Sequence, residues 1–192
     1  MARRGESRER MLRAAARLFQ RQGYGATGLN QVVEEGSAPK GSLYFHFPGG
    51  KEQLAAEAVS MAGAELGTAM AATAARAEDV GEAIMAVAEL FAAELERSDY
   101  RAGCPVATVA LDAAADSEPI RAACDGTYSS WLAGMAELLR RHRVEDAEAV
   151  AVLVVSAIQG ALLLARVRRD ATVVRSTARQ VADLALAAKG AR

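Results

Sequence analysis

From residue 51 onward, apolar residues recur at the three- and four-residue spacing of α-helices, in six long segments separated by short breaks. Alanine, the strongest helix former, occupies 45 of the 192 positions, and only four prolines interrupt the chain. Aromatic residues make up 5% of the chain, which is too few for a sandwich or barrel. The sequence therefore predicts an all-α protein with long helices at 51–75, 79–98, 104–114, 117–142, 145–168 and 172–189.

The first 50 residues follow a different pattern, in which short helices alternate with glycine-rich turns. An amphipathic helix ends at Gly23. Further along, a tight turn begins at Gly36, and Pro48 ends the last short helix. The pattern predicts three helices in this region, at 6–22, 29–35 and 40–47. Two short helices joined by a tight glycine turn are the layout of a helix-turn-helix motif.

The balanced charge of the whole chain hides an asymmetry. The chain holds 23 basic and 24 acidic residues, yet residues 1–51 hold nine basic and only four acidic ones. This part has a net charge of +5, and the remainder has a net charge of −6. A basic N-terminal part on an acidic body favours an anionic partner for the former, and a solvated helix face is the alternative.

Motifs for other functions lack the context that they need. The glycines at 23–28 match a dinucleotide-binding pattern, but a helix precedes them and position 48, where an acidic residue is required, is Pro. Two histidines and two cysteines do not occur at metal-ligand spacing, and no nucleophile lies near a base. We therefore expect no catalytic residue, no metal and no cofactor.

We expect neither a signal peptide nor a membrane span in this sequence. The charged N-terminus lacks a following apolar core, and the longest uncharged stretch, 149–165, is interrupted by Ser156 and Gln159. This stretch is interpreted as a buried helix, and the protein is expected in the cytoplasm. Cys104 and Cys124 are interpreted as small buried hydrophobic residues, with oxidant sensing as the alternative.

Three stretches of this sequence together resemble the TetR family of transcriptional regulators. They are Gly-Tyr-x-Ala-Thr at 23–27, Pro-Lys-Gly-Ser-Leu-Tyr-Phe-His-Phe at 39–47 and Lys-Glu-x-Leu at 51–54. Residues 47–52 and 103–107 are in addition similar to the LmrA/YxaF-like branch of that family. The resemblance is close over residues 8–60 and elsewhere extends only to the succession of long helices.

The resemblance implies a three-helix DNA-binding head at 1–50, joined to a helical ligand-binding and dimerisation domain at 51–192. It implies a homodimeric repressor that binds palindromic double-stranded operator DNA and is released by a small hydrophobic effector. Two positions depart from the family pattern. Gly28 stands where Ser or Thr usually caps the second helix, and Gly36 lies one position earlier than the usual turn glycine.

Seven residues are candidate DNA contacts: Thr27, Lys40, Gly41, Ser42, Tyr44, His46 and Lys51. Lys40 can bond guanine O6 and N7, Ser42 can donate or accept a hydrogen bond, and Gly41 allows a close approach to the major groove. The resemblance implies that the other four contact phosphates, although Tyr44 also fits a packing position and His46 a solvated one. The core of the head is expected to include three alternating apolar residues, Leu43, Phe45 and Phe47.

Apolar stripes on the later helices fit either a ligand pocket or an ordinary core. The resemblance implies an effector cavity, whose candidate residues are Phe91, Cys104, Tyr128, Trp131 and Met135. The last two helices carry more apolar surface than one side of a small bundle can cover, which favours a two-fold interface. The candidate interface residues are Val155, Ile158, Leu162, Val181 and Leu184. The alternatives are a helical-bundle enzyme and a DNA-binding dimer without a ligand pocket.

Overall fold

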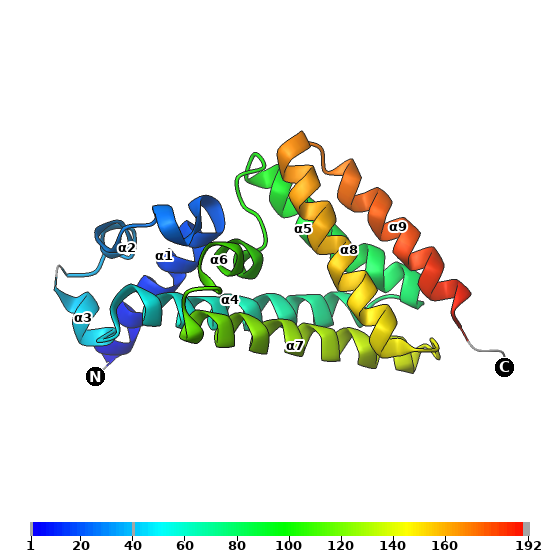
Figure 1. The fold of residues 1–192 in the computed structure, drawn as a ribbon, viewed down its shortest axis with the longest axis horizontal. Coiled ribbons are helices and arrows are strands. Elements are labelled where there is room, and N and C mark those ends of the chain that lie inside the picture. The colour runs from blue at the N-terminus through cyan, green and yellow to red at the C-terminus, as the bar shows by residue number, and fades with distance from the viewer. Residues whose placement is uncertain (1, 40, 190–192) are drawn as a thin grey trace. The chain divides into compact units, whose positions relative to one another are not determined.

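The protein consists of helices and turns in the computed structural model, which describes residues 2–39 and 41–189 (Figure 1). Within these residues no β-strand is present, and a single isolated bridge pairs Val144 with Lys189. The all-α prediction is therefore confirmed. The helices are α1 (Ala2–Ala26), α2 (Leu29–Glu35), α3 (Ser42–His46), α4 (Gly50–Ala74), α5 (Val80–Arg97), α6 (Pro105–Ala113), α7 (Glu118–Arg141), α8 (Ala147–Arg168) and α9 (Thr172–Ala187).

The six long helices begin and end within two residues of their predicted positions, because their ends depend on local chemistry. At the start of α5, the Asp79 carboxylate accepts the Glu82 backbone N–H at 2.9 Å, and the Glu82 carboxylate accepts the Glu78 N–H at 2.9 Å. This reciprocal arrangement satisfies backbone donors that the helix cannot pair internally, and it lowers the pKa of Asp79. Pro105 opens α6, where its missing N–H costs nothing.

The chain divides into two compact units. The first unit contains Met1–Glu65 and Cys104–Thr127, and the second contains Leu66–Gly103 and Tyr128–Arg192. Both α4 and α7 run from one unit into the other. In the first unit α6 packs extensively on α1, and the largest fully buried side chains there include Met11, Phe19, Phe47, Leu54, Val106, Val109 and Ile120.

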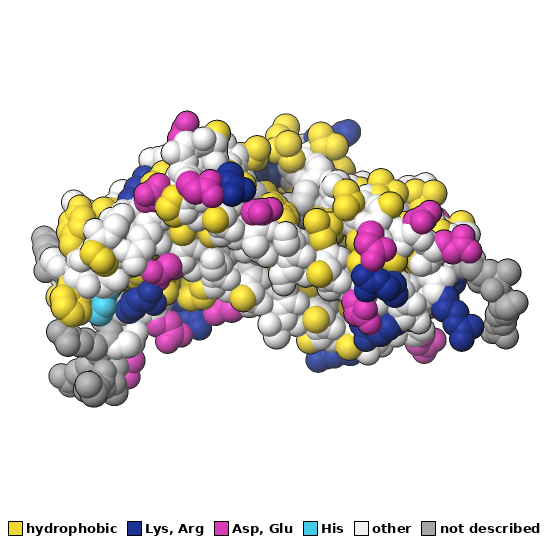
Figure 2. Space-filling model, turned by 60° about the horizontal axis from the view of Figure 1, so that its bottom comes forward, with side chains coloured by type: hydrophobic (Ala, Val, Ile, Leu, Met, Phe, Trp, Pro, Cys, Tyr) yellow, Lys and Arg dark blue, Asp and Glu magenta, His cyan; other side chains and the backbone are white. Residues whose placement is uncertain are grey.

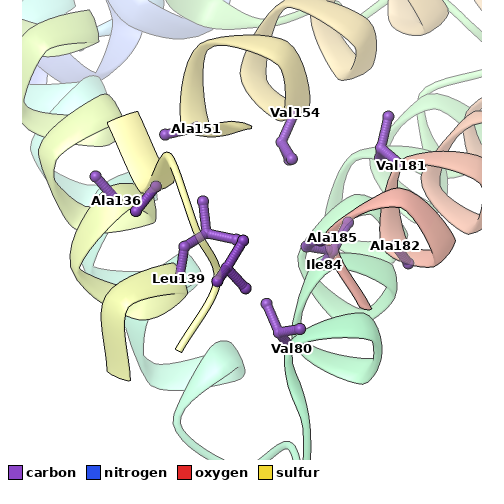
Figure 3. Close-up of a cluster of buried hydrophobic side chains, with 11 residues drawn as sticks. Val80, Ile84, Ala136, Leu139, Ala151, Val154, Val181, Ala182 and Ala185 are labelled. Carbon is purple, nitrogen blue, oxygen red and sulfur yellow. The ribbon is translucent and has the colours of Figure 1, made fainter. Parts of the chain in front are cut away.

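The core of the second unit lies where four helices meet (Figure 3). Among the described residues, helices α5 and α9 form the most extensive helix pair, and α8 packs on both of them. Most of the core residues are alanine or valine, so the helix axes can approach closely. The buried side chains of this core come from α5, α7, α8 and α9, and those labelled in Figure 3 are Val80, Ile84, Ala136, Leu139, Ala151, Val154, Val181, Ala182 and Ala185.

Helix α8 combines a buried face with an unusually apolar exposed face. It is the one helix among the described residues whose length and hydropathy would allow a membrane span, and a third of its most apolar window is buried. Core helices of soluble proteins have the same composition. Charged residues occur in α8 only near its two ends. Its exposed apolar side chains are Val152, Leu153, Leu163, Leu164 and Val167.

Candidate nucleic-acid interface

Helices α2 and α3 form the two short arms of the predicted helix-turn-helix motif, with a turn that packs against α1. A Cβ atom added at Gly36 would lie 3.0 Å from the Val32 carbonyl oxygen and 3.3 Å from Met11 Cα, which is tighter than ordinary contact, so this position favours glycine. The Arg10 Nε also donates to the Gly36 carbonyl at 3.1 Å. The next residue, Ser37, takes the left-handed conformation with φ 47°. The early turn glycine is thus explained by packing, and Ser37 takes the strained position.

The two faces of α3 differ sharply. Leu43 is buried in the first unit, and so is Phe47, which caps the helix at its end. Tyr44 and Phe45 point outward, with 64% and 60% of their surfaces exposed. Figure 2 shows hydrophobic side chains gathered on the surface at the α3 end of this unit. The prediction that Phe45 belongs to the core is therefore wrong.

His46 lies beside this outward face and contacts aromatic rings on both sides. Its ring centre is 5.2 Å from that of Phe45, edge to face, and 6.4 Å from that of Phe47. The guanidinium of Arg8 lies over the Phe47 ring at 5.1 Å and forms an ion pair with Glu57. The histidine is half-buried, so the aromatic contacts fix its ring at the edge of the exposed α3 surface.

The start of α3 is open to its surroundings. Gly41 has φ 91°, and a Cβ atom added there would meet nothing within 4 Å. The Ser42 hydroxyl donates to the Pro39 carbonyl at 2.8 Å, which leaves its lone pairs as possible acceptors. Lys40, the predicted base contact, lies outside the described residues.

Lys51 lies in the first turn of α4, half-buried against the end of α1. Its Nζ is 4.3 Å from the centre of the Tyr24 ring and 3.4 Å from the Gly25 carbonyl oxygen, to which it donates. Burial lowers the pKa of Lys51, and the Asp112 carboxylate acts in the opposite direction. The same burial, reinforced by Glu52, raises the pKa of Tyr24. The Lys51 side chain therefore packs against the end of α1 while part of its surface stays exposed.

Thr27 differs from the expectation that it contacts a phosphate. Its side chain is buried, and its hydroxyl donates to the Gly23 carbonyl at 2.7 Å and lies 3.2 Å from Gln22 Nε2, which donates to it. The helix cap at Gly28 has no side-chain hydrogen bond. The prediction for Thr27 is corrected accordingly, because its hydroxyl closes the turn after α1 in the interior of the protein.

Asp112 of α6 is a neighbour of this region that the sequence did not indicate. Its Oδ2 accepts the Gly25 N–H at 3.3 Å, and it lies so close to Gly23 that a Cβ atom there would overlap it. Gly23 has φ 86° and ψ 168°, and it interrupts α1 where the sequence predicted the end of that helix. Because 87 residues separate Asp112 from Gly25, no local pattern could have revealed the contact.

Comparisons with known proteins identify the family that has this succession of helices. Residues 11–58 match the N-terminal region of bacterial regulatory proteins of the tetR family. Residues 80–180 match the C-terminal domain of LmrA/YxaF-like transcriptional regulators. The chain belongs to the TetR family. The resemblance noted in the sequence is confirmed, including its LmrA/YxaF-like branch.

TetR-family relatives match over nearly their whole length. The HTH-type regulators YxaF and LmrA of Bacillus subtilis are 39% and 38% identical to this chain, over 94% of it and over 96% and 97% of their own lengths. A TetR regulator from Chloroflexus aurantiacus has a TM-score of 0.81 at 27% identity, over 95% of this chain and 96% of that one. These relatives are transcriptional regulators, so the helical-bundle enzyme alternative is set aside.

The residues expected at an effector pocket do not fall into one unit. Tyr128, Trp131 and Met135 lie on one stripe of α7 in the second unit, which also contains Phe91, whereas Cys104 belongs to the first unit. The Trp131 and Tyr128 rings meet edge to face at 5.5 Å. A Cβ atom added at Gly67 of α4 would lie 3.1 Å from the Trp131 Nε1. The tryptophan therefore packs closely against the backbone of α4.

The residues expected at a dimer interface require a correction. Ile158 and Leu162 of α8 and Val181 of α9 are buried within the second unit, and so cannot form a surface. Val155 is half-buried, and Leu184 is exposed. The sequence alone could not show which face of α8 is buried, because the helix has apolar residues of its own on nearly all sides.

Proposed function

We propose that this TetR-family regulator is a cytoplasmic, ligand-responsive repressor. It binds palindromic operator DNA as a homodimer and is released by a small hydrophobic effector. The observation that carries the DNA-binding role is the outward face of α3, where Tyr44 and Phe45 are exposed on the second arm of a helix-turn-helix motif. The net charge of +5 over residues 1–51 supports an anionic partner for this face.

Polar groups around this face provide contacts to the phosphate backbone. The Tyr44 hydroxyl and the His46 imidazole lie on α3, and the Lys51 ammonium lies at the start of α4. Ser42 and Lys40 are the proposed contacts to base edges. Phosphate contacts set the register of a protein on DNA, whereas base contacts determine which sequence is bound.

Exposed aliphatic side chains on α8 support a homodimer. Val152, Leu163 and Val167 follow one another at helical spacing on one side of α8, and Leu184 of α9 is also exposed. A two-fold axis would pair this surface with the same surface of a second copy. The two heads would then read half-sites about one helical turn apart, ~34–36 Å, in a palindromic site.

The aromatic stripe of α7 supports a hydrophobic effector. Tyr128 and Trp131 present large, rigid rings, Met135 is flexible, and all three lie in the second unit. A ligand that binds more tightly to one arrangement of these helices shifts the protein toward that arrangement. The effector would release DNA if the favoured arrangement does not fit the operator.

Selection of duplexes from a random pool tests the DNA-binding role. Wild-type protein should enrich a palindrome, and its affinity should fall about 10³–10⁵-fold between 50 and 200 mM salt if each dimer makes roughly 6–10 phosphate contacts. The variant Lys40→Ala should relax the preference at one base per half-site, whereas His46→Ala should weaken all sequences about equally. A flat salt response would contradict the proposed DNA binding.

Titrations with a panel of flat, multi-ring hydrophobic compounds test the effector role. A bound compound should quench the single tryptophan, Trp131, and should bind more weakly when operator DNA is present. The factor by which operator DNA weakens binding of the compound must equal the factor by which the compound weakens DNA binding. Trp131→Ala should weaken the release of DNA by the compound, and Trp131→Phe, which keeps a ring in place, serves as its folded control. Because both variants lack the tryptophan, their response is measured by DNA release. Equal affinity with and without operator would favour a dimerisation module without ligand coupling.

A further inference from the structure

Phe45 occupies the centre of the outward face of α3. Successive helical residues turn by about 100°, so Phe45 lies roughly 200° around the helix from the buried Leu43. Tyr44 and His46 therefore lie on the two flanks, with Phe45 between them and 60% of its surface exposed. The edge-to-face contact with His46, at 5.2 Å, helps to hold the Phe45 ring in this position.

The surroundings of α3 leave Phe45 prominent. At the start of the helix, a Cβ atom added at Gly41 would meet nothing within 4 Å, so the described residues do not crowd this end of α3. On the opposite side, Leu43 and Phe47 anchor the segment in the interior. A helix that enters the major groove with this face forward would therefore bring the Phe45 ring to the edges of the bases.

The chemistry of a phenylalanine ring limits what Phe45 can recognise there. It has no hydroxyl or amino group, so it can neither donate a hydrogen bond to a phosphate nor bond a polar base edge. The apolar group that distinguishes one base from the others in the major groove is the C5-methyl group of thymine. Contact with that methyl group removes apolar surface of both partners from water.

We propose that Phe45 is a specificity-determining residue that reads one thymine in each half-site through its C5-methyl group. The inference rests on the proposed DNA binding and assigns to α3 an apolar base contact besides the polar ones. Tyr44 and His46, on the flanks of the same helix, hold the backbone on either side of this contact.

Replacement of thymine by uracil tests this contact directly, because it removes only the methyl group. The probe is the duplex that wild-type protein selects from a random pool, with each thymine replaced in turn by uracil in both half-sites. At one symmetric pair of positions, wild-type affinity should fall about fourfold per methyl group, or about 15-fold in total. Phe45→Ala should bind the thymine and uracil duplexes with equal affinity, and Phe45→Leu should keep part of the difference.

Two controls separate this contact from a general loss of structure. Leu111→Ala removes an exposed apolar side chain from the same unit and should leave the thymine preference unchanged, since Leu111 is 81% exposed on α6. Tyr44→Phe should weaken both duplexes alike. Thermal melting identifies any variant that does not fold, in which case Phe45→Leu provides the comparison.

The outcomes distinguish this inference from the proposed function. If wild-type protein enriches a duplex but no uracil replacement weakens binding to it, the thymine contact is overturned and the proposed DNA binding stands. The same conclusion would follow if Phe45→Ala retained the full difference between thymine and uracil. If wild-type protein enriched no duplex at all, the proposed DNA binding would fail, and the inference would fail with it.

Discussion

The two units both expose apolar side chains, but of different kinds and in different settings. In the first unit, two aromatic residues stand on a five-residue helix, α3, among polar neighbours. In the second unit, aliphatic residues follow one another along the 22-residue helix α8, whose charged residues are confined to the regions near its ends. One surface is short and mixed in character, and the other is long and uniformly apolar.

This difference indicates different partners. A short surface of aromatic and polar groups in a region of positive charge suits an anionic polymer with small apolar features, such as DNA. A long aliphatic surface without charge suits another apolar surface, and a second copy of the same chain provides one by symmetry. Exposed apolar area alone would have assigned both surfaces to the same role.

The units also differ in what stabilises them. In the first unit, the backbone of Gly36 lies against that of Met11, and Gly23, at a positive φ, lies against the Asp112 side chain. In the second unit, small apolar side chains fill a shared core, and Arg175 of α9 joins α5 through ion pairs with Glu89 and Glu96. We expect the first unit to be sensitive to backbone changes and the second to changes of apolar surface and charge.

The largest expected effect comes from placing a charge on the α8 surface. Leu163→Glu puts two carboxylates into the proposed two-fold interface, one from each subunit, and burial of an unpaired charge costs several kcal/mol. Self-association should weaken by at least about 100-fold, and operator binding should weaken with it. Sedimentation equilibrium over a range of concentrations measures the dissociation constant.

A matched control for this variant is Leu111→Glu. Leu111 is more exposed than Leu163, but it is an isolated apolar residue on α6 of the first unit. Isolated exposed apolar residues carry no expectation of a partner, so self-association should stay at the wild-type level. Dimers of Leu163→Glu that are as stable as those of wild type would remove α8 from the proposed interface.

Gly23→Ala tests the dependence of the first unit on backbone conformation. The φ of 86° and ψ of 168° belong to a region that only glycine adopts readily, and a Cβ atom would overlap the Asp112 carboxylate. The substitution should lower the stability of the protein by about 2 kcal/mol, which calorimetry measures as a lower Tm. The double variant Gly23→Ala, Asp112→Ala removes the overlap. It should regain only part of the lost stability, because the backbone strain remains.

Local patterns predicted much of this fold, but not which faces are buried. Proline, glycine and helix-capping residues such as Asp79 act within a few residues, so helix ends could be predicted. Phe45 was misassigned because the alternation of Leu43, Phe45 and Phe47 has a period of two, whereas a helix turns Phe45 away from Leu43. The Asp112 contact had no sequence signal, because it joins helices that are far apart in the chain.

Arg175→Ala tests the ion pairs of the second unit. Arg175 donates to both oxygens of Glu89, at 2.7 and 2.8 Å, and to both of Glu96, at 2.7 and 2.9 Å. Arg175 and the two glutamates are partly exposed, so Arg175→Ala should lower the Tm at pH 7 by about 2 °C. These hydrogen bonds lower the pKa of both glutamates.

The pH dependence of Arg175→Ala follows from the direction of these pKa shifts. A carboxylate whose pKa is lowered by folding contributes stability above its unfolded pKa, about 4.3 for glutamate, and loses it as the pH falls through the folded value. The difference in Tm between wild type and Arg175→Ala should therefore be constant near neutral pH and shrink below about pH 4. A difference that grew in acid would contradict the assigned ion pairs.

The last expected effect is on chemical reactivity and not on assembly or stability, and it concerns the interior of the first unit, which contains both cysteines. Burial, reinforced by the neighbouring Cys104, raises the pKa of the Cys124 thiol to about 11. Because the thiolate is the reactive form, alkylation of Cys124 by iodoacetamide at pH 8 should be at least about 100-fold slower in folded protein than in urea. Mass spectrometry of timed samples measures both rates, and Cys104→Ser should change the folded rate only slightly, since burial is the larger cause. If folded protein were labelled at the rate seen in urea, Cys124 would be an accessible thiol. Oxidant sensing by the cysteines would then be favoured over a packing role.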